Sequence, residues 1–372
     1  MKITLLFLFL ILLKPVFFMG GSINYEKEVT SLVPHLYEAF ILMIFIIIYT
    51  VKYQFRLYYD RSFLYFYFLY FYIISLLSTV WSMYPIMTVF YSLKGIAYIV
   101  LAGFMLKEIS DKPHYTIKLF KFTIFMCIVS ALVNAIGTLP FSTYSVKGLQ
   151  SGYLTLLALS LYIYSRQYAT KNMNYSFKFS EVPLYYLGSI SSILAINLSR
   201  LTLAFIQKSF FSKIKVLIVL TIFISILFLF ISNEKGFLGK DLSGLKSGSG
   251  RFDVWLFLII QWINDSVFIF GNGMFSDIVY LERFKAQIPW AHTAHNSLLS
   301  LYLGLGLIGL LFYFVLTIHV IKEIFKKQNS LFLLLALYLY GLTSNIFPGS
   351  PSLLIVFSII ITSSKLGKKS DV

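Results

Sequence analysis

A histidine, two arginines and paired glycines stand out in this chain because most of the surrounding sequence is apolar. Arginine binds anions and keeps its charge, whereas histidine exchanges protons near neutral pH. Ionisable groups at membrane depth are costly, so their presence there indicates a functional site. The set lies mainly between 251 and 309 and comprises Arg251, Trp255, Gly271, Gly273, His295 and Asn296, with Arg200 earlier in the chain.

Composition sets the class of protein that carries these residues. The chain has 372 residues, of which 58% are hydrophobic and only 12% are charged, and its mean hydropathy is +0.81. Soluble domains are about half apolar and a quarter charged. Apolar runs long enough to cross a bilayer recur from end to end. We therefore expect an all-α, polytopic integral membrane bundle of about 12 transmembrane helices with one large extracytoplasmic loop.

The net charge of +16 does not indicate nucleic-acid binding, because the basic residues are scattered over short loops between apolar runs. That distribution is the positive-inside pattern of membrane proteins. A single cysteine, Cys127, excludes a disulfide within this chain and a cysteine-based zinc site. The sequence offers no cluster of metal ligands, and we expect neither a metal nor another cofactor.

Hydropathy predicts where the chain crosses the membrane, and the charges predict its orientation. The run from 183 to 212 must be split near Asn197–Arg200, because otherwise one of its two flanking lysine clusters would lie outside the cytoplasm. The split gives twelve spans, two cytoplasmic termini, and Arg200, Arg251 and His295 on the extracytoplasmic side. The predicted apolar runs are 3–19, 36–51, 63–80, 86–106, 116–137, 148–165, 183–212, 214–232, 294–317, 329–347 and 351–364.

The spans divide into N-terminal membrane helices, 1–182, and a catalytic membrane region, 183–372, which includes the extracytoplasmic loop 233–292. Residues 252–263 fit a helix that lies in the membrane interface, anchored by Trp255 and Trp262. Lys94 falls near the middle of the run 86–106, where we expect it to face a polar cavity. The N-terminal run after Lys2 also looks like a signal peptide, but no A-x-A cleavage site follows, and we interpret it as the first span.

At these residues the chain resembles the O-antigen ligase and O-antigen polymerase family of bacterial polysaccharide biosynthesis membrane proteins. The resemblance rests on Ser199-Arg200 at a span end, Arg251 with Trp255 in the large loop, and the turn Gly271-Asn272-Gly273. It continues with His295-Asn296 opening a helix that carries Gly304 and Gly309, and with Trp81, Ser82 and Pro85 in a tight loop. The order, spacing and shared side of these motifs carry the resemblance.

The resemblance implies a bacterial inner-membrane glycosyltransferase, with its active site on the extracytoplasmic face, that uses a glycan donor on undecaprenyl diphosphate. Arg200 and Arg251 would neutralise the departing diphosphate, since arginine binds two oxygens at once. His295 would take the proton of the acceptor hydroxyl or bind the diphosphate at a helix N-terminus, with Thr293 as the expected N-cap. Substrate-binding residues would be Asn296, Trp255, Gly271, Gly273 and Lys94.

Several functions share these motifs. Polymerisation of surface-polysaccharide repeats, such as O-antigen or capsule, is the first, and ligation of finished glycan to lipid A core is the second. A flippase or exporter of the lipid-linked glycan is the non-enzyme alternative, and a transferase that uses Glu26 or Glu28 as base is another enzyme alternative. Expected partners are the donor, a glycan acceptor, membrane lipid, and possible chain-length regulator and flippase proteins, but no nucleic acid.

Overall fold

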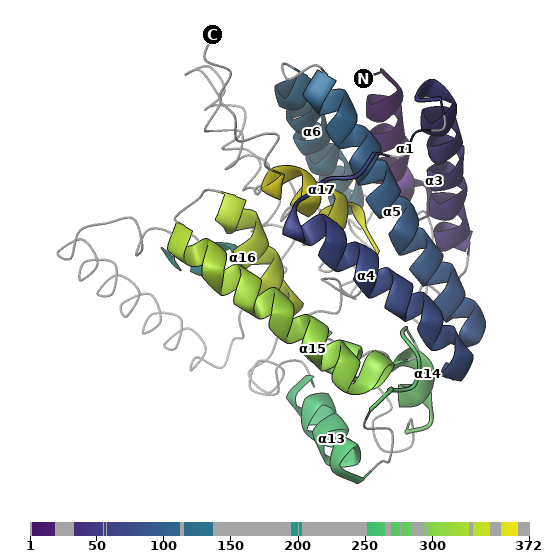
Figure 1. Ribbon diagram of the computed structural model, residues 1–372, viewed down its shortest axis with the longest axis vertical. Helices are drawn as coiled ribbons and strands as arrows, with labels where there is room; N and C mark the ends of the chain where they lie inside the picture. The colour runs from purple at the N-terminus through teal and green to yellow at the C-terminus, as the bar shows by residue number, and fades with distance from the viewer. Residues whose placement is uncertain are drawn as a thin grey trace, which may run out of the picture.

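Every described element of the computed structural model is a helix, and the described residues include no strand, as expected of an all-α protein. Figure 1 shows the helices α1, α3, α4, α5 and α6 grouped side by side, with α15 crossing below them towards α14. The structure describes residues 2–18, 33–54, 56, 58–111, 115–136, 195–199, 201–202, 251–264, 269–275, 277–284, 294, 296–326, 330–342 and 351–363.

The helices coincide with the predicted apolar runs wherever those runs are described. Within the described residues, three helical stretches are long and apolar enough to cross a membrane, namely Phe63–Trp81, Pro85–Asp111 and Ser297–Glu323. The runs 148–165 and 214–232 lie outside the described residues. The helices are α1 (Lys2–Phe18), α3 (Val33–Lys52), α4 (Phe63–Leu77), η1 (Ser78–Trp81), α5 (Pro85–Asp111), α6 (Tyr115–Ile136), α13 (Arg251–Asn264), α14 (Asp277–Glu282), α15 (Ser297–Lys326), α16 (Ser330–Gly341) and α17 (Leu353–Thr362).

One apolar core joins the two segments that were predicted from the sequence. Leu8, Phe68 and Phe104 from the N-terminal helices belong to the same buried cluster as Leu305 and Phe357 from the C-terminal helices. Between membrane helices, packing of this kind stabilises the fold mainly through van der Waals contacts, because lipid tails are as apolar as the side chains that they replace. The described helices of 1–182 and 183–372 therefore share one packed interior.

Close approach of α4 and α5 depends on small residues. The ring of Tyr72 packs directly on Gly95, where an added Cβ would lie only 2.3 Å from the ring. Gly103 likewise meets the backbone carbonyl of Tyr58. Small residues at such positions let helices approach closely in membrane proteins. Pro85 opens α5 at the first helical position, where a missing N–H costs nothing.

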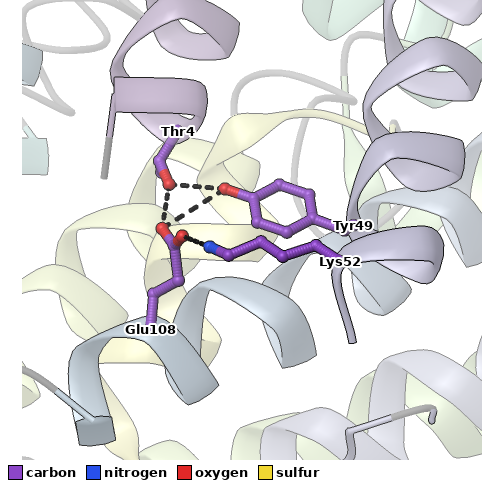
Figure 2. A network of polar contacts seen from close by, with 4 residues as sticks. All are labelled: Thr4, Tyr49, Lys52 and Glu108. Carbon is purple, nitrogen blue, oxygen red and sulfur yellow. Dashed lines mark hydrogen bonds and ion pairs between the residues drawn. The ribbon is translucent and has the colours of Figure 1, made fainter. Parts of the chain in front are cut away.

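At one end of the bundle, Glu108 of α5 joins three helices, as Figure 2 shows. Thr4 of α1 and Lys52 of α3 both donate hydrogen bonds to its carboxylate. The Tyr49 hydroxyl donates to the same carboxylate over 3.4 Å and contacts Thr4. We call this the basic end, because Lys52, Arg56, Arg61 and Lys107 lie there.

The basic end also receives the C-terminal helix. Ser363, directly after α17, donates a 3.1 Å hydrogen bond to the buried carboxylate of Asp60, which precedes α4. α15 runs antiparallel to α4, since Tyr67 contacts the Phe312 carbonyl and Phe63 stacks on His319. The C-terminal end of α15 therefore lies towards the basic end, and the start of α15 lies at the opposite end, close to η1.

The described residues on both sides of Arg200 are helical, and Arg200 itself lies outside the described residues. Residues 195–199 and 201–202 are helical, and the Thr202 hydroxyl donates to the Leu198 carbonyl over 2.8 Å. A bond from a threonine hydroxyl to the carbonyl four residues earlier is a helical contact. The interruption predicted at Asn197–Arg200 is thus not found in the described residues that flank it, and the count of twelve spans stays a prediction.

Candidate functional site

The glycine turn, residues 269–275, inserts into a break in α15. The Asn272 N–H donates to the Leu303 carbonyl over 2.8 Å, and the Leu307 N–H donates to the Ile269 carbonyl over 3.1 Å. Between these two bonds Gly306 leaves helical geometry, with φ 61° and ψ −137°. In a continuous helix the Leu303 carbonyl would accept the Leu307 N–H. Here it accepts the N–H of Asn272 instead, so the inserted turn supplies the hydrogen bonds that the break removes.

The same turn is held from its other side by η1 and the loop that follows. Trp81 donates its indole N–H to the Phe270 carbonyl over 2.8 Å, and the Met83 N–H bonds the Asn272 carbonyl. The Met274 N–H bonds the Ser78 hydroxyl. Three chain segments that are distant in sequence therefore meet at the glycine turn.

Gly271 and Gly273, predicted to bind substrate, make this packing possible. Both have positive φ, 68° and 88°, which glycine adopts without strain. A Cβ on Gly271 would lie 2.5 Å from the Gly304 backbone, and one on Gly273 would lie 2.3 Å from Ser82. Gly304 of α15 packs against this turn, because a Cβ there would lie 3.0 Å from the Met274 sulfur.

Trp255 joins α13 to the segment before α15. Its indole N–H donates to the Ala294 carbonyl over 2.9 Å. Ala294 is completely buried in a small second core. Trp255 was predicted to anchor α13 in the interface, but its polar atom faces the protein. The outward surface of α13 is formed by Leu256, Ile259 and Ile260, which are 61, 40 and 48% exposed.

The second core holds α13, α14 and the start of α15 together. It lies at the end of the molecule opposite the basic end, where Figure 1 places α13 and α14 below the bundle. Its buried members are Val254, Leu258, Tyr280, Leu281, Ala294, Leu299 and Leu303.

Asn296, predicted to bind substrate, caps α15. Its side-chain oxygen accepts the Leu299 N–H over 3.1 Å, and its amide donates to the Leu342 carbonyl at the end of α16 over 2.9 Å. The first N–H groups of a helix have no partner within the helix, and the side-chain oxygen of an asparagine at the N-cap accepts one of them. The expected cap, Thr293, was therefore wrong, because α15 begins four residues later at Ser297.

Two buried carboxylates near this end were missed by the sequence reasoning. Asp277 opens α14, is 7% exposed, and accepts a 3.3 Å hydrogen bond from Ser300 in the first turn of α15. Glu38 of α3 is 6% exposed. Both lie within electrostatic reach of the Tyr91 phenol. In the sequence, an acidic residue in a predicted loop and one in an apolar run carry no local signal that identifies such neighbours.

Lys94 of α5 has Glu38 as its partner. The Lys94 Nζ lies 2.9 Å from the Glu38 carboxylate, and the Tyr98 hydroxyl donates to the same carboxylate. The Tyr91 ring centroid lies 5.7 Å from the Lys94 Nζ. Lys94 was expected to face a polar cavity, and the polar group that it faces in the structure is a compensating carboxylate. Glu38 thus largely cancels the charge that Lys94 would offer to a phosphate.

The described residues bring some members of the predicted site together. Arg251 begins α13, one helical turn before Trp255, and Trp255 bonds the residue that precedes His295. Asn296 lies two residues from Ala294 at the same junction. The side chain of Arg251 and the residues Arg200 and His295 lie outside the described residues. Within the described part of the chain, no group of three histidine, cysteine or acidic side chains is arranged to hold a metal.

Comparison of the chain with models of known protein families, with curated proteins and with solved structures finds no match.

Proposed function

We propose that this chain is an integral-membrane glycosyltransferase of the O-antigen polymerase and ligase type. It would move a glycan from undecaprenyl diphosphate to an acceptor glycan and so lengthen a surface polysaccharide. The observation that carries the proposal is the bond between Trp255 and Ala294. It links the helix that begins with Arg251 to the chain segment that leads into His295.

In the proposed reaction, the acceptor hydroxyl oxygen attacks the anomeric carbon of the donor sugar. The bond between that carbon and the diphosphate oxygen breaks, and its electron pair leaves with the diphosphate. The hydroxyl proton passes to a base, for which His295 is the candidate. Arg251 and Arg200 would neutralise the charge that develops on the leaving diphosphate, because arginine offers two parallel hydrogen bonds.

The proposed location is the bacterial inner membrane with the glycine turn on the extracytoplasmic side. Support comes from the basic end, which gathers Lys52, Arg56, Arg61 and Lys107. Lysine and arginine are enriched on the cytoplasmic side of membrane proteins. The opposite end, with η1, the glycine turn and the start of α15, would then face outwards, where lipid-linked repeats are polymerised.

A reconstitution tests this proposal. The purified full-length protein is placed in liposomes with undecaprenyl-diphosphate-linked oligosaccharide, which is isolated from cells that lack this protein. We expect longer lipid-linked glycans and one undecaprenyl diphosphate released for each bond formed. Transfer to lipid A core, without chain growth, would identify a ligase instead. The absence of both products, while the donor remains bound, would overturn the glycosyltransferase proposal.

A flippase or exporter of lipid-linked glycan is the second candidate, and one observation favours it. Glu38 and Lys94 are ionisable groups buried within helices, and such groups often mark transport pathways. Liposomes that contain a fluorescent lipid-linked oligosaccharide distinguish the two functions. Movement of the probe between leaflets without any change in glycan length would favour transport, and chain growth without movement would favour the transferase.

A further inference from the structure

The junction between α13 and α15 depends on one side chain that the proposed chemistry does not use directly. The Ala294 carbonyl is buried and belongs to no helix, and it accepts the indole N–H of Trp255. A buried carbonyl that loses its donor pays the full cost of desolvation. The bond between Trp255 and Ala294 is therefore a strong determinant of how α13 sits against the start of α15.

The two residues that form this bond lie close in the sequence to the two proposed chemical groups, Arg251 and His295. Arg251 lies four residues before Trp255 on a regular helix, so the two positions share one face, about 6 Å apart along the axis. His295 directly follows Ala294, and adjacent α-carbons are about 3.8 Å apart. Any shift of Trp255 relative to Ala294 therefore shifts the start of α13, with position 251, relative to the start of α15.

We propose that Trp255 is a positioning residue, whose indole N–H fixes the start of α13, which carries Arg251, against the chain segment that leads into α15. The proposal rests on the proposed glycosyltransferase function. It replaces the expectation that Trp255 binds substrate, because the polar atom of the indole is already used within the protein. The half-buried ring packs against the second core. The bond from its N–H to the Ala294 carbonyl fixes the orientation of the ring.

The test removes the N–H and keeps the ring. Trp255→Phe does so with natural residues, and benzothienylalanine at the same position keeps the bicyclic shape while sulfur replaces the N–H. The matched control is Trp81→Phe, which removes an indole bond of 2.8 Å to the Phe270 carbonyl at the same end of the molecule. Folding of each variant is checked by thermal unfolding in detergent.

Two measurements read the outcome. Spin labels at exposed positions 253 and 311, in a Cys127→Ala background, report the distance between α13 and α15 by pulsed EPR. We expect both Trp255 variants to broaden or shift this distance, and Trp81→Phe to leave it unchanged. A misplacement near 1 Å reduces rates by about a hundredfold, so we expect kcat for glycan transfer to fall about 10- to 100-fold with a smaller change in donor KM.

The other possible results would overturn either the positioning role of Trp255 or the proposed glycosyltransferase function. An unchanged EPR distance in both Trp255 variants overturns the positioning role. An increase in donor KM without loss of kcat also overturns it, because that pattern is expected of a residue that binds substrate. Wild-type protein that transfers no glycan overturns the proposed function itself, whatever the EPR distance shows. The failure of the function and the failure of the positioning role are therefore separate results.

Discussion

Glu38 and Lys94 form an ion pair between α3 and α5, with the lysine Nζ 2.9 Å from the carboxylate. Both side chains are almost completely removed from solvent, and Tyr98 donates a further hydrogen bond to Glu38. Coulomb attraction is strong where water is excluded, but each ion has also lost its hydration. Such a pair is therefore costly to break and less costly to replace as a whole.

Single substitutions in this pair should be more harmful than the double substitution. Glu38→Gln leaves the Lys94 charge buried without its carboxylate, and Lys94→Met leaves Glu38 without its cation. Each should lower the free energy of unfolding by about 3–5 kcal/mol, whereas the double variant should recover most of that loss. Unfolding in detergent, analysed as a double-mutant cycle, measures this coupling. Additive losses would show that the two charges do not stabilise each other.

The same variants test whether Lys94 also binds donor phosphate. If the lysine only pairs with Glu38, the stable double variant should keep the wild-type donor KM. If it binds the carrier phosphate as well, the double variant should fold normally and yet show a raised donor KM. Assaying the folded double variant keeps this question apart from stability.

Orientation in the membrane can be tested with cysteines at described, exposed positions. In a Cys127→Ala background, Tyr84→Cys and Glu282→Cys lie at the end with the glycine turn, and Tyr59→Cys lies at the basic end. A membrane-impermeant maleimide added to intact cells should label positions 84 and 282 but not 59, because basic loops stay in the cytoplasm. Labelling of position 59 alone would place the glycine turn in the cytoplasm and remove the proposed active-site side.

The positions of the helices could be predicted from the sequence because their apolar runs are long. The run 86–106 lies within α5, and the run 63–80 corresponds to α4 together with η1. A bilayer requires about twenty apolar residues per helix, so hydropathy alone locates such segments. Helix starts were less predictable: Thr293 and Asn296 are both good caps, and only the tertiary bond from Asn296 to Leu342 distinguishes them.

Contacts between distant segments had no signal in the sequence. Glu38 and Lys94 are 56 residues apart, and their pairing follows from the packing of α3 on α5. The break at Gly306 needed the inserted turn, because a glycine in an apolar run indicates close packing as readily as a break. Trp255 was predicted as part of the site, whereas its bond to Ala294 depends on how α13 folds back.

The glycine turn should tolerate no side chain at position 273. Gly273→Ala introduces a Cβ that lies 2.3 Å from Ser82 and forces an L-residue to φ 88°. The backbone conformation alone costs about 1–2 kcal/mol, and the overlap with Ser82 adds to it. We expect a lower unfolding temperature and loss of activity. Adding Ser82→Gly should restore little of the stability, because the backbone Cα of Ser82 also lies 2.4 Å from the added Cβ; full recovery would show that this backbone approach is not the cause.

Arg251 should not be replaceable by lysine if it binds the donor diphosphate. Lysine keeps the positive charge but loses the planar pair of donors that binds two oxygens. Arg251→Lys should therefore fold and insert normally, yet lose most transfer activity in reconstituted liposomes, and Arg251→Ala should lose more. Full activity of purified Arg251→Ala on lipid-diphosphate glycan would remove this residue from the mechanism, and the same assay on Arg200→Ala would then show whether that arginine acts alone.

His295 is expected to take the proton of the acceptor hydroxyl. His295→Ala should insert and still bind the lipid-linked donor, but its turnover should fall by about a hundred- to ten-thousandfold, as is typical when a general base is removed. His295→Gln separates two roles, because glutamine forms hydrogen bonds but cannot accept a proton at neutral pH. Near-normal turnover of His295→Gln would leave the histidine as a diphosphate ligand and require another base. If His295→Ala is also active while Glu26→Ala or Glu28→Ala is inactive, the acidic first loop supplies the base. Loss of activity in chelator, restored by a divalent metal, would favour that alternative, whereas the histidine mechanism predicts no effect of chelator.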